Sequence, residues 1–257
     1  MTNKVALITG GAKRIGASIS QSLHANGFDV IIHHSTSIQH AHALVDEFNA
    51  IRPNSAKCVQ ADLGIVNDSL TLQQFYQQVM DCFGRLDVLV HNASSFYATP
   101  LDGSVERLHQ QWDDLFLTNA KAPFFISQVF LNELKNNNGQ IISILDIHAD
   151  NKPFIGYPIY TMAKTAHRMM VQSLALELAP KVRINGVSPG VNIFPDDNSN
   201  AQLNDDTKAL LTDSIPLACI GTPNDIANAV LFFVQASYIT GQVLAVDGGR
   251  SLTLKGG

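Results

Sequence analysis

The sequence predicts an α/β protein built on one Rossmann-type, doubly wound sheet of about seven parallel strands, with helices on both faces. Short apolar runs alternate with longer helical patterns along the chain, which is typical of a parallel sheet with helical crossovers. The apolar runs are continuous rather than alternating, as expected of strands covered on both sides. A glycine-rich turn follows the first run, where such folds bind nucleotides.

The first strand is expected at 5–9, where VALIT precedes the glycine-rich turn and a helix over about 14–26. Further strands, each followed by helical periodicity, are expected at 29–34 (helix 38–50), 57–60 (70–83), 86–92 (two stretches within 104–135) and 139–145 (157–178). The sixth strand, 182–188, leads into 191–236, and a seventh, 241–249, ends the series. No linker, repeat or low-complexity tract interrupts the pattern, so we expect a single domain over 1–257.

The segment 192–215 differs from the rest because it is polar and acidic. It follows the carboxyl end of a strand, and ligands of doubly wound sheets bind outside those ends. Two interpretations remain open, a solvated surface excursion and a lid over the substrate. We predict the lid.

Composition limits the classes of partner. The chain has 257 residues, of which 46% are hydrophobic and 15% charged, and a net charge of -5. Neither a nucleic acid nor an anionic membrane is expected as a partner of such a chain. No apolar run approaches the length of a membrane helix, and three cysteines stand far apart without a CxxC motif. We expect a cytoplasmic protein with buried thiols and a small-molecule substrate.

The stretch TGGAKRIG (9–16) predicts a dinucleotide-binding turn. Glycines let the backbone approach a pyrophosphate, and the helix N-terminus offers free N–H groups and a favourable dipole. The spacing departs from GxGxxG because an arginine occupies the middle glycine position. The expected cofactor-binding residues of this turn are Gly10, Lys13, Arg14, Ile15 and Gly16.

The end of the second strand predicts NADP rather than NAD. An acid there would bind the adenosine ribose, but HHSTS (33–37) has none. The hydroxyls nearby can donate to a 2′-phosphate, and two cations on the first turn add positive charge. We expect cofactor contacts from His34, Ser35, Thr36 and Ser37. No metal site is expected, because adjacent strand residues face opposite ways.

Two further strand ends border the expected cofactor. Asp62 can accept the adenine amino group, with the Leu63 backbone beside it. Asn92 and Ala93 end the fourth strand, where we expect the ribose.

Tyr160 and Lys164 are predicted to carry the chemistry, because i and i+4 share one face of the long helix. A phenol has a pKa of about 10, and a nearby ammonium is expected to lower it. Tyrosine could then act as a general acid toward a group that receives hydride. Asn119 lies in mid-helix, either as a local kink or cap, or to hold a water that relays protons to Lys164.

These motifs, together with RINGVSPG and ITGQVLAVDGG, resemble the short-chain dehydrogenase/reductase family over essentially the whole chain. The resemblance implies NAD(P)-dependent hydride transfer, with Tyr160, Lys164 and Asn119 in the roles just described. It also implies cofactor contacts from Tyr160, Lys164, Pro189 and Gly190, and association into homodimers or homotetramers through the helices at 123–135 and 157–178.

A narrower resemblance is to the pteridine reductases of that family, through RPNSAKCVQADL, GRLDVLVHNASSFYATPL and IYTMAK. It implies NADPH-dependent reduction of a dihydropterin or dihydrofolate. It further implies that Phe96 stacks on the pterin, that Ser94 and Arg14 make polar contacts, and that Asp146 lies beside Tyr160. The chain departs from that pattern in the second-strand motif, where Thr36 stands in place of an arginine. The loop from Asp146 to Tyr160 is one residue longer than expected.

An acid at 146 suits a pterin better than a ketone. A carbonyl oxygen needs a donor, whereas a pterin offers ring N–H groups and needs a proton on nitrogen when its C=N bond is reduced. Asp146 could accept from the N–H groups or pass a proton through Tyr160 or water, or simply cap the strand end. The alternatives are a ketone or 3-oxoacyl reductase and a non-catalytic NADPH sensor. A hydrolase is excluded because Pro189 of GVSPG has no N–H for an oxyanion hole.

Overall fold

The structure, a computed structural model, describes residues 3–193 and 204–253. Its sheet has seven strands in the order β3-β2-β1-β4-β5-β6-β7, and each neighbouring pair is parallel. The strands are β1 (Val5–Ile8), β2 (Asp29–His34), β3 (Ala56–Gln60), β4 (Val88–His91), β5 (Gln140–Ile144), β6 (Arg183–Pro189) and β7 (Val243–Val246). The predicted fold class is confirmed.

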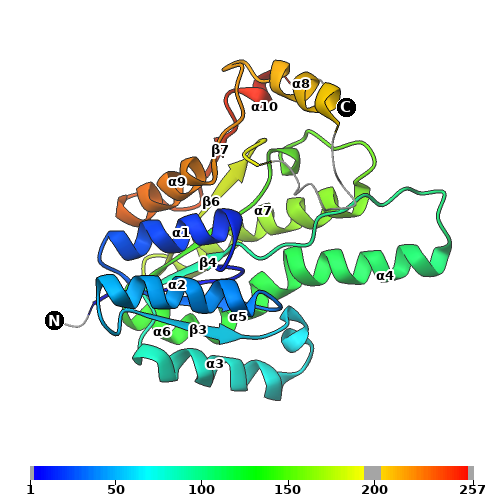
Figure 1. The fold of residues 1–257 in the computed structure, drawn as a ribbon. Coiled ribbons are helices and arrows are strands. Elements are labelled where there is room, and N and C mark those ends of the chain that lie inside the picture. The colour runs from blue at the N-terminus through cyan, green and yellow to red at the C-terminus, as the bar shows by residue number, and fades with distance from the viewer. Residues whose placement is uncertain (1–2, 194–203, 254–257) are drawn as a thin grey trace.

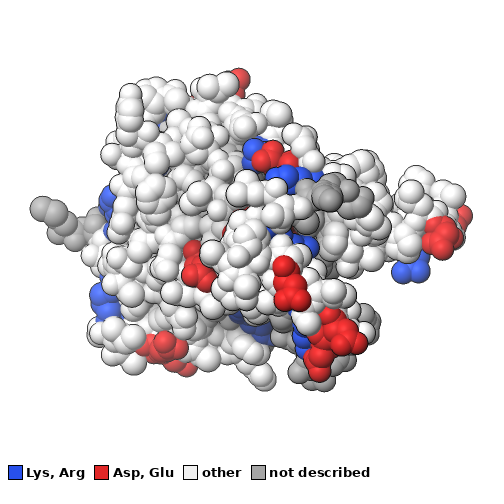
Figure 2. Space-filling view, turned by 90° about the horizontal axis from the view of Figure 1, so that it is seen from above, with Lys and Arg blue, Asp and Glu red and all other residues white. Residues whose placement is uncertain are grey.

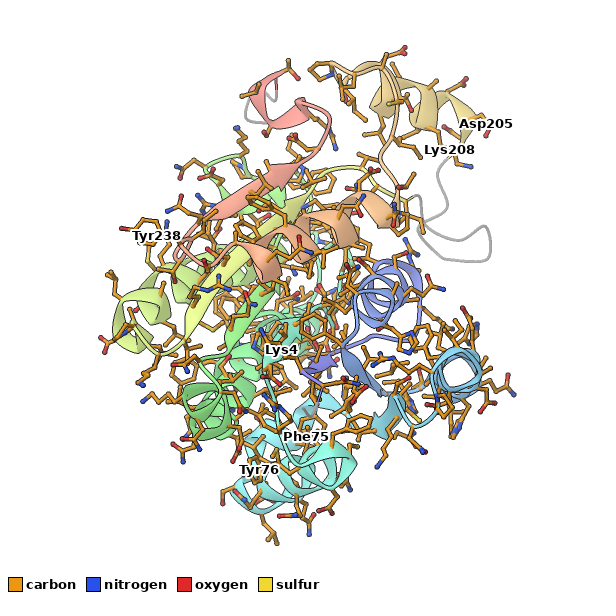
Figure 3. The ribbon with its side chains drawn as sticks, turned by 90° about the vertical axis from the view of Figure 1, so that its left-hand side faces the viewer. Lys4, Phe75, Tyr76, Asp205, Lys208 and Tyr238 are labelled. Atoms are coloured by element: carbon orange, nitrogen blue, oxygen red, sulfur yellow. The ribbon has the colours of Figure 1, made fainter. Side chains whose placement is uncertain are left out.

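Helices cover both faces of the sheet (Figure 1). One face carries α1 (Arg14–Ala25), α2 (Ile38–Ile51) and α9 (Pro223–Gln235), and the other carries α3 (Ser69–Phe83), α5 (Ala122–Val129) and α7 (Pro158–Leu178). Successive strand residues face opposite layers, so Ile31 packs in one core cluster and Ile32 in the other. Phe75 on α3 is buried against Phe130, while Tyr238 is fully exposed at the edge of the molecule (Figure 3).

The strand order reverses at β1, which lies between β2 and β4. The connections after these strands therefore leave in opposite directions and open a crevice at their carboxyl ends. Both the glycine-rich turn after β1 and the residues after β4 lie at this edge. The topology alone thus places the predicted cofactor residues together.

The two helical stretches predicted within 104–135 are α4 (Val105–Phe116) and α5, but several shorter elements are absent from the sequence prediction. The π-helical turn η2 (Leu117–Lys121) separates α4 from α5, and α6 (Leu131–Asn136) follows α5. Single turns occur at η1 (Leu63–Asn67), η3 (Ile147–Ala149) and α10 (Arg250–Thr253). Elements this short have no detectable periodicity, because they span about one turn.

The predicted lid lies partly outside the described residues, which omit 194–203. Its described remainder contains α8 (Asp205–Asp213). Figure 1 shows α8 beside α10, outside the two helical layers, and Thr253 Oγ1 donates to the Ser214 carbonyl at 3.3 Å. The second part of 192–215 therefore packs with the segment that follows β7.

No helix within residues 3–193 or 204–253 is long and apolar enough to cross a membrane. The face in Figure 2 carries small groups of basic and acidic side chains side by side rather than a basic stripe. The cysteines are free, but the prediction that they are buried is wrong: Cys58 and Cys82 are half-buried and Cys219 is exposed.

Candidate active site

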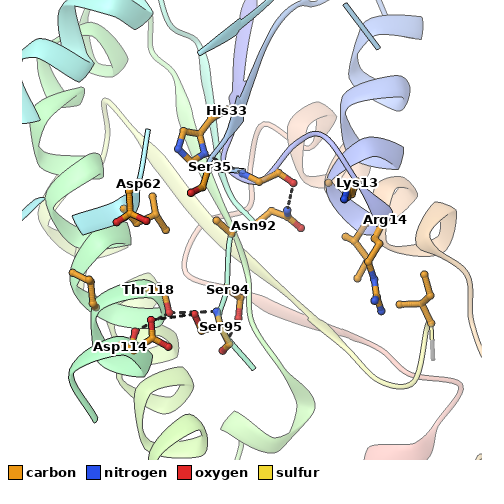
Figure 4. Close-up of a pocket in the computed structure, with 17 residues that line it drawn as sticks. Lys13, Arg14, His33, Ser35, Asp62, Asn92, Ser94, Ser95, Asp114 and Thr118 are labelled. Atoms are coloured by element: carbon orange, nitrogen blue, oxygen red, sulfur yellow. Dashed lines mark hydrogen bonds between the residues drawn. The ribbon is translucent and has the colours of Figure 1, made fainter. Parts of the chain in front are cut away.

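A cleft of about 530 Å³ opens at the carboxyl ends of β1, β2 and β4. Figure 4 shows Lys13 and Arg14 on one side of it and Asp62, Asp114 and Thr118 on the other. Of the predicted cofactor residues, the cleft is lined by Gly10, Lys13, Arg14, Ile15, Gly16, Ser35, Asp62, Leu63, Asn92 and Ala93. Ser94, predicted to contact substrate, lines the same cleft.

The glycine-rich turn is held closed by packing that admits no side chain. A Cβ on Gly16 would overlap the carbonyl oxygen of Gly10, and Gly10 itself has φ +62°. Asn92 Nδ2 donates to the carbonyls of Thr9 and Gly10, at 3.0 Å each. The turn thus has the tight, bare backbone that a pyrophosphate requires, and its residues fit a dinucleotide.

Arg14 adopts a strained backbone conformation. Its φ is +53°, in the left-handed region that favours glycine and costs other residues about 1–2 kcal/mol. The arginine thus occupies a glycine position in sequence and in backbone conformation. Its side chain is exposed in the cleft.

His33, rather than the predicted His34, faces the cleft. Its Nδ1 accepts from the Gly10 N–H at 3.2 Å, so its Nε2 donates to the Ala61 carbonyl at 3.1 Å. Burial lowers the pKa of His33 to about 4, so the ring stays neutral and can make both hydrogen bonds. His34 is buried away from the cleft because successive strand residues alternate faces.

Of the other residues expected at the 2′-phosphate, Thr36 and Ser37 lie apart from the cleft wall, whereas Ser35 lines it. Thr36 is exposed, and Ser37 precedes α2 without capping it. Ser35 lines the cleft, and its carbonyl accepts from Gln60 Nε2 at 2.9 Å. Across the cleft, Asp62 Oδ1 accepts from the Gly64 N–H at 2.7 Å and caps η1.

A second cavity, of about 410 Å³, is lined by two of the four candidate catalytic residues, Asp146 and Tyr160, while Lys164 and Asn119 are not part of its wall. The Tyr160 hydroxyl donates to Asp146 Oδ2 at 2.8 Å, while Asp146 Oδ1 accepts from the His148 N–H at 2.8 Å. The carboxylate therefore caps η3 and binds the tyrosine at once. Pro189 and Gly190, predicted at the cofactor, line this cavity at the end of β6.

The electrostatics of Tyr160 differ from the sequence prediction. Burial raises its pKa well above the ordinary value, and the charge and hydrogen bond of Asp146 raise it further. The predicted lowering by Lys164 is wrong for this arrangement. Lys164 Nζ lies 5.9 Å from the ring centre and donates instead to the Ile144 carbonyl at 3.0 Å.

Lys164 is itself strongly perturbed. It is only 3% exposed, and burial lowers its pKa to about 8 although Asp146 opposes the shift. Its ammonium and neutral amine are therefore close in free energy near neutral pH.

Asn119 lies within the π-helical turn η2, so the predicted kink is present. Its Nδ2 donates to the carbonyls of Ser95 (2.9 Å) and Leu115 (3.0 Å), and its Oδ1 accepts from the Ser94 hydroxyl at 2.5 Å. The side chain joins the segment after β4 to the helix. The predicted water relay remains a hypothesis.

A pair of buried histidines, which sequence reasoning did not single out, lies behind Lys164. The rings of His91 and His167 are 6.0 Å apart. His91 Nε2 lies 2.8 Å from Ser127 Oγ, and His167 Nε2 lies 2.9 Å from Ser143 Oγ. Burial lowers both pKa values, that of His91 to about 3, so this network adds no charge beside the lysine.

Aromatic rings line one side of the second cavity. Phe96 is 48% exposed and stacks on Tyr157, with ring centres 4.8 Å apart and planes within 6°. Tyr157 stacks in turn on Phe154 at 4.4 Å, and Phe96 meets Tyr160 edge-on at 4.8 Å. The predicted stacking residue thus lies beside the tyrosine, within a larger aromatic group that the sequence did not indicate.

Residues from distant segments complete the cavity. Thr207 and Leu211 of α8 and Arg250 of α10 line it together with Asp146. The sequence prediction included the first two only as part of a lid and missed Arg250. The sequence shows an arginine directly after the DGG turn. No local pattern around that turn, however, indicates contact with a substrate.

Comparisons with known proteins agree with this geometry. A family described as "Enoyl-(Acyl carrier protein) reductase" matches residues 10–251. "Pteridine reductase 1" of Leishmania tarentolae is 38% identical, covering 98% of each chain. "3-oxoacyl-[acyl-carrier-protein] reductase FabG" of Staphylococcus epidermidis is 34% identical, covering 96% of this chain and 98% of its own. "Uncharacterized oxidoreductase YmfI" of Bacillus subtilis is 31% identical over 96% of this chain.

The doubly wound sheet and the dinucleotide cleft, taken with these relatives, define the protein as an NAD(P)-dependent reductase that acts on a small molecule. It belongs to the short-chain dehydrogenase/reductase family.

The closed glycine turn generates a first prediction. Gly16→Ala forces a methyl group against the Gly10 carbonyl, so the turn must open and the affinity for the dinucleotide cofactor should fall by about tenfold or more. Gly103→Ala is the matched control, because its Cβ would meet only ordinary van der Waals contacts. Fluorescence titration measures both. Equal affinities of the two variants would contradict the role of this turn.

The buried lysine generates a second prediction. Because the pKa of Lys164 falls from 10.5 to about 8 on folding, the unfolded state binds more protons between those pH values. The free energy of unfolding of the wild type should therefore rise with pH across this window, by about 3 kcal/mol at most, relative to Lys164→Met. Urea denaturation of both proteins at pH 7.5 and about pH 10 measures the difference. A difference that does not change with pH would show that folding does not lower the pKa of Lys164.

Proposed function

We propose that this enzyme uses NADPH to reduce a dihydropterin, or dihydrofolate, to its tetrahydro form. The observation that carries the proposal is the hydrogen bond from the Tyr160 hydroxyl to the Asp146 carboxylate inside the second cavity. The 38% identity to pteridine reductase 1 supports the same substrate class.

The pair at Asp146 and Tyr160 favours a substrate with N–H groups. An ionised carboxylate only accepts hydrogen bonds, so it cannot steady a carbonyl oxygen as a hydroxyl would. It can accept from the ring N–H and amino groups of a pterin. The raised pKa of Tyr160 keeps its proton in place near neutral pH, which suits proton donation in a reduction rather than proton abstraction from an alcohol.

The aromatic wall favours a flat substrate. Phe96, Tyr157 and Phe154 present nearly parallel rings beside Tyr160. A planar pterin ring would gain about 0.5–1.5 kcal/mol from such stacking beyond the burial of its area. Phe96 is the exposed member of the group and is proposed to contact the substrate ring.

Each side chain has a defined part in the reduction. Bound NADPH would supply hydride to the carbon of the C=N bond. Tyr160 donates a proton to the nitrogen, and Asp146 orients the ring and passes a replacement proton from water. Lys164, close to its transition near neutral pH, offers a second proton source behind Tyr160. Asn119, through the π-helical turn, fixes the segment of Ser94 and Ser95 at the border of both cavities.

NADPH is proposed over NADH because no carboxylate follows β2 near the adenosine ribose. Ser35 lines the cleft at that point, and the exposed Lys13 and Arg14 face it from the first turn. A 2′-phosphate would receive charge-assisted hydrogen bonds there.

A second candidate is reduction of a 3-oxoacyl thioester, as the FabG relatives at 34% identity suggest. The carboxylate at 146 disfavours this substrate, because a carbonyl oxygen would meet a second acceptor. A purely NADPH-binding role is disfavoured by Lys164, because its burial lowers its pKa to about 8 and therefore costs stability at neutral pH.

The substitution of Asp146 tests the proposed substrate. Asp146→Asn should lower kcat/KM on dihydropterins by about 10²–10⁴-fold, while NADPH affinity is retained, because the amide neither carries charge nor releases a proton. Asp146→Ser should be equally poor on pterins yet gain slow turnover of an activated ketone or 3-oxoacyl thioester. NADPH oxidation assayed with all three proteins on both substrate classes decides the matter. If the wild type were active only on 3-oxoacyl thioesters, 3-oxoacyl reduction would replace pterin reduction as the function of the enzyme.

Cofactor preference follows from the same site. NADPH should bind at least about tenfold more tightly than NADH, since each charge-assisted contact contributes about 1.5–3 kcal/mol. Lys13→Gln should weaken NADPH more than NADH, and fluorescence titration of both cofactors checks each expectation. Equal affinity of the wild type for the two cofactors would rule out a 2′-phosphate site.

We also propose that residues 1–257 form one domain with a lid at 192–215, and that the chain forms a homo-oligomer through α7 and α5. Met162, Met169 and Leu176 recur every seven residues along α7 and are all exposed, as are Phe124 and Phe125 on α5. Replacing Met169 and Leu176 with Glu should dissociate the oligomer in sedimentation velocity. A monomeric wild type would contradict the proposal.

A further inference from the structure

The side chain of Arg250 is buried at the second cavity, and no hydrogen bond within the described residues accounts for its burial there. Arg250 begins α10, directly after the turn at Gly248 and Gly249, and only 8% of it is exposed. It lines the cavity that also contains Asp146 and Tyr160. Within the described residues, its Nε is buried and has no hydrogen-bond partner. A buried guanidinium donor left unpaired is costly, so its retention points to a ligand.

The neighbouring carboxylates attract Arg250 but are bonded elsewhere. Asp146 and Asp247 both raise its pKa, against the larger lowering by burial. Asp247 accepts from the N–H groups of Gly249 (3.0 Å) and Ser251 (2.6 Å), and Asp146 accepts from Tyr160 and His148. The two acids therefore balance the charge of Arg250.

The position of Arg250 is fixed by its turn. Gly248 and Gly249 have φ of +63° and +86°, and a Cβ on Gly249 would lie 3.2 Å from Pro216. The Leu217 N–H donates to the Gly248 carbonyl at 3.2 Å. Arg250 is thus held against the segment that follows α8, and α8 lies beside α10 and contributes Thr207 and Leu211 to the same cavity (Figure 1). The aromatic wall and the phenol belong to other segments, from Phe96 and α7.

This arrangement divides the cavity by chemistry. The ring of a substrate would meet Phe96, Tyr160 and Asp146, so its substituent would extend toward α8 and α10. Arginine offers several donors in a planar fork and matches oxygen atoms held close together. A substituent rich in hydroxyl or carboxylate oxygens fits such a partner, and an aliphatic one does not.

We propose that Arg250 is a specificity-determining residue that binds the oxygen-bearing substituent of the substrate ring, as hydroxyls of a polyol side chain or as a carboxylate. This inference rests on the proposed pterin reduction and names the part of the pterin that the enzyme selects. Asp146 and Tyr160 act on the bond that is reduced, whereas Arg250 discriminates between pterins by their substituents.

The test compares three substrates that share the ring: 6-methyl-7,8-dihydropterin, dihydromonapterin with its trihydroxypropyl chain, and dihydrofolate with its glutamate. We expect the wild type to prefer an oxygen-bearing substrate, by kcat/KM, and Arg250→Met to reduce that preference over the methyl compound by about tenfold or more. The substrate whose advantage disappears distinguishes hydroxyl from carboxylate recognition. Arg107→Met, at an exposed arginine of α4, is the matched control and should keep the wild-type ratio.

Arg250→Lys retains the charge without the planar fork and should give an intermediate ratio, which also serves if the Met variant does not fold. NADPH affinity and thermal melting report on folding of each variant. An equal loss on all three substrates, or unchanged ratios, would overturn the role of Arg250 while leaving pterin reduction by the wild type intact. A wild type that reduces none of the three would instead overturn the proposed function, and this inference with it.

Discussion

The contact between the Tyr160 hydroxyl and the Asp146 carboxylate is the interaction on which the site depends. It joins the end of β5 to the first turns of α7, and the same carboxylate caps η3. Burial and that negative charge both hold the proton on the phenol. The geometry therefore favours a phenol that keeps its proton near neutral pH.

The surrounding residues supply what this pair lacks. Lys164 is buried one turn further along α7, and neutral histidines lie behind it. Charge is thereby concentrated on few atoms in a low-dielectric region, where it acts strongly on a reacting group. The π-helical turn also supports the site, because it directs the side-chain amide of Asn119 toward the segment after β4.

Residues with strong local or periodic signals were predictable from sequence. Apolar runs predict the strands, and the glycines predict a turn whose backbone must approach a ligand closely. The helical period predicts that Tyr160 and Lys164 share a face. The role of Asp146 was predicted from the family resemblance. His33 was missed because the end of β2 does not reveal which of two adjacent histidines faces the cleft. The pKa direction of Tyr160 depends on distances that no sequence pattern contains. Arg250 was missed because its neighbours in the cavity lie between 39 and 154 residues away in the chain.

The two cavities draw on different parts of the chain. Apart from Ile193, the wall of the dinucleotide cleft comes from residues 10–118, and apart from Phe96, the wall of the second cavity comes from 146–250. Substitutions that reshape the dinucleotide cleft therefore fall mostly in the first half of the chain, and those that reshape the second cavity fall mostly in the second half.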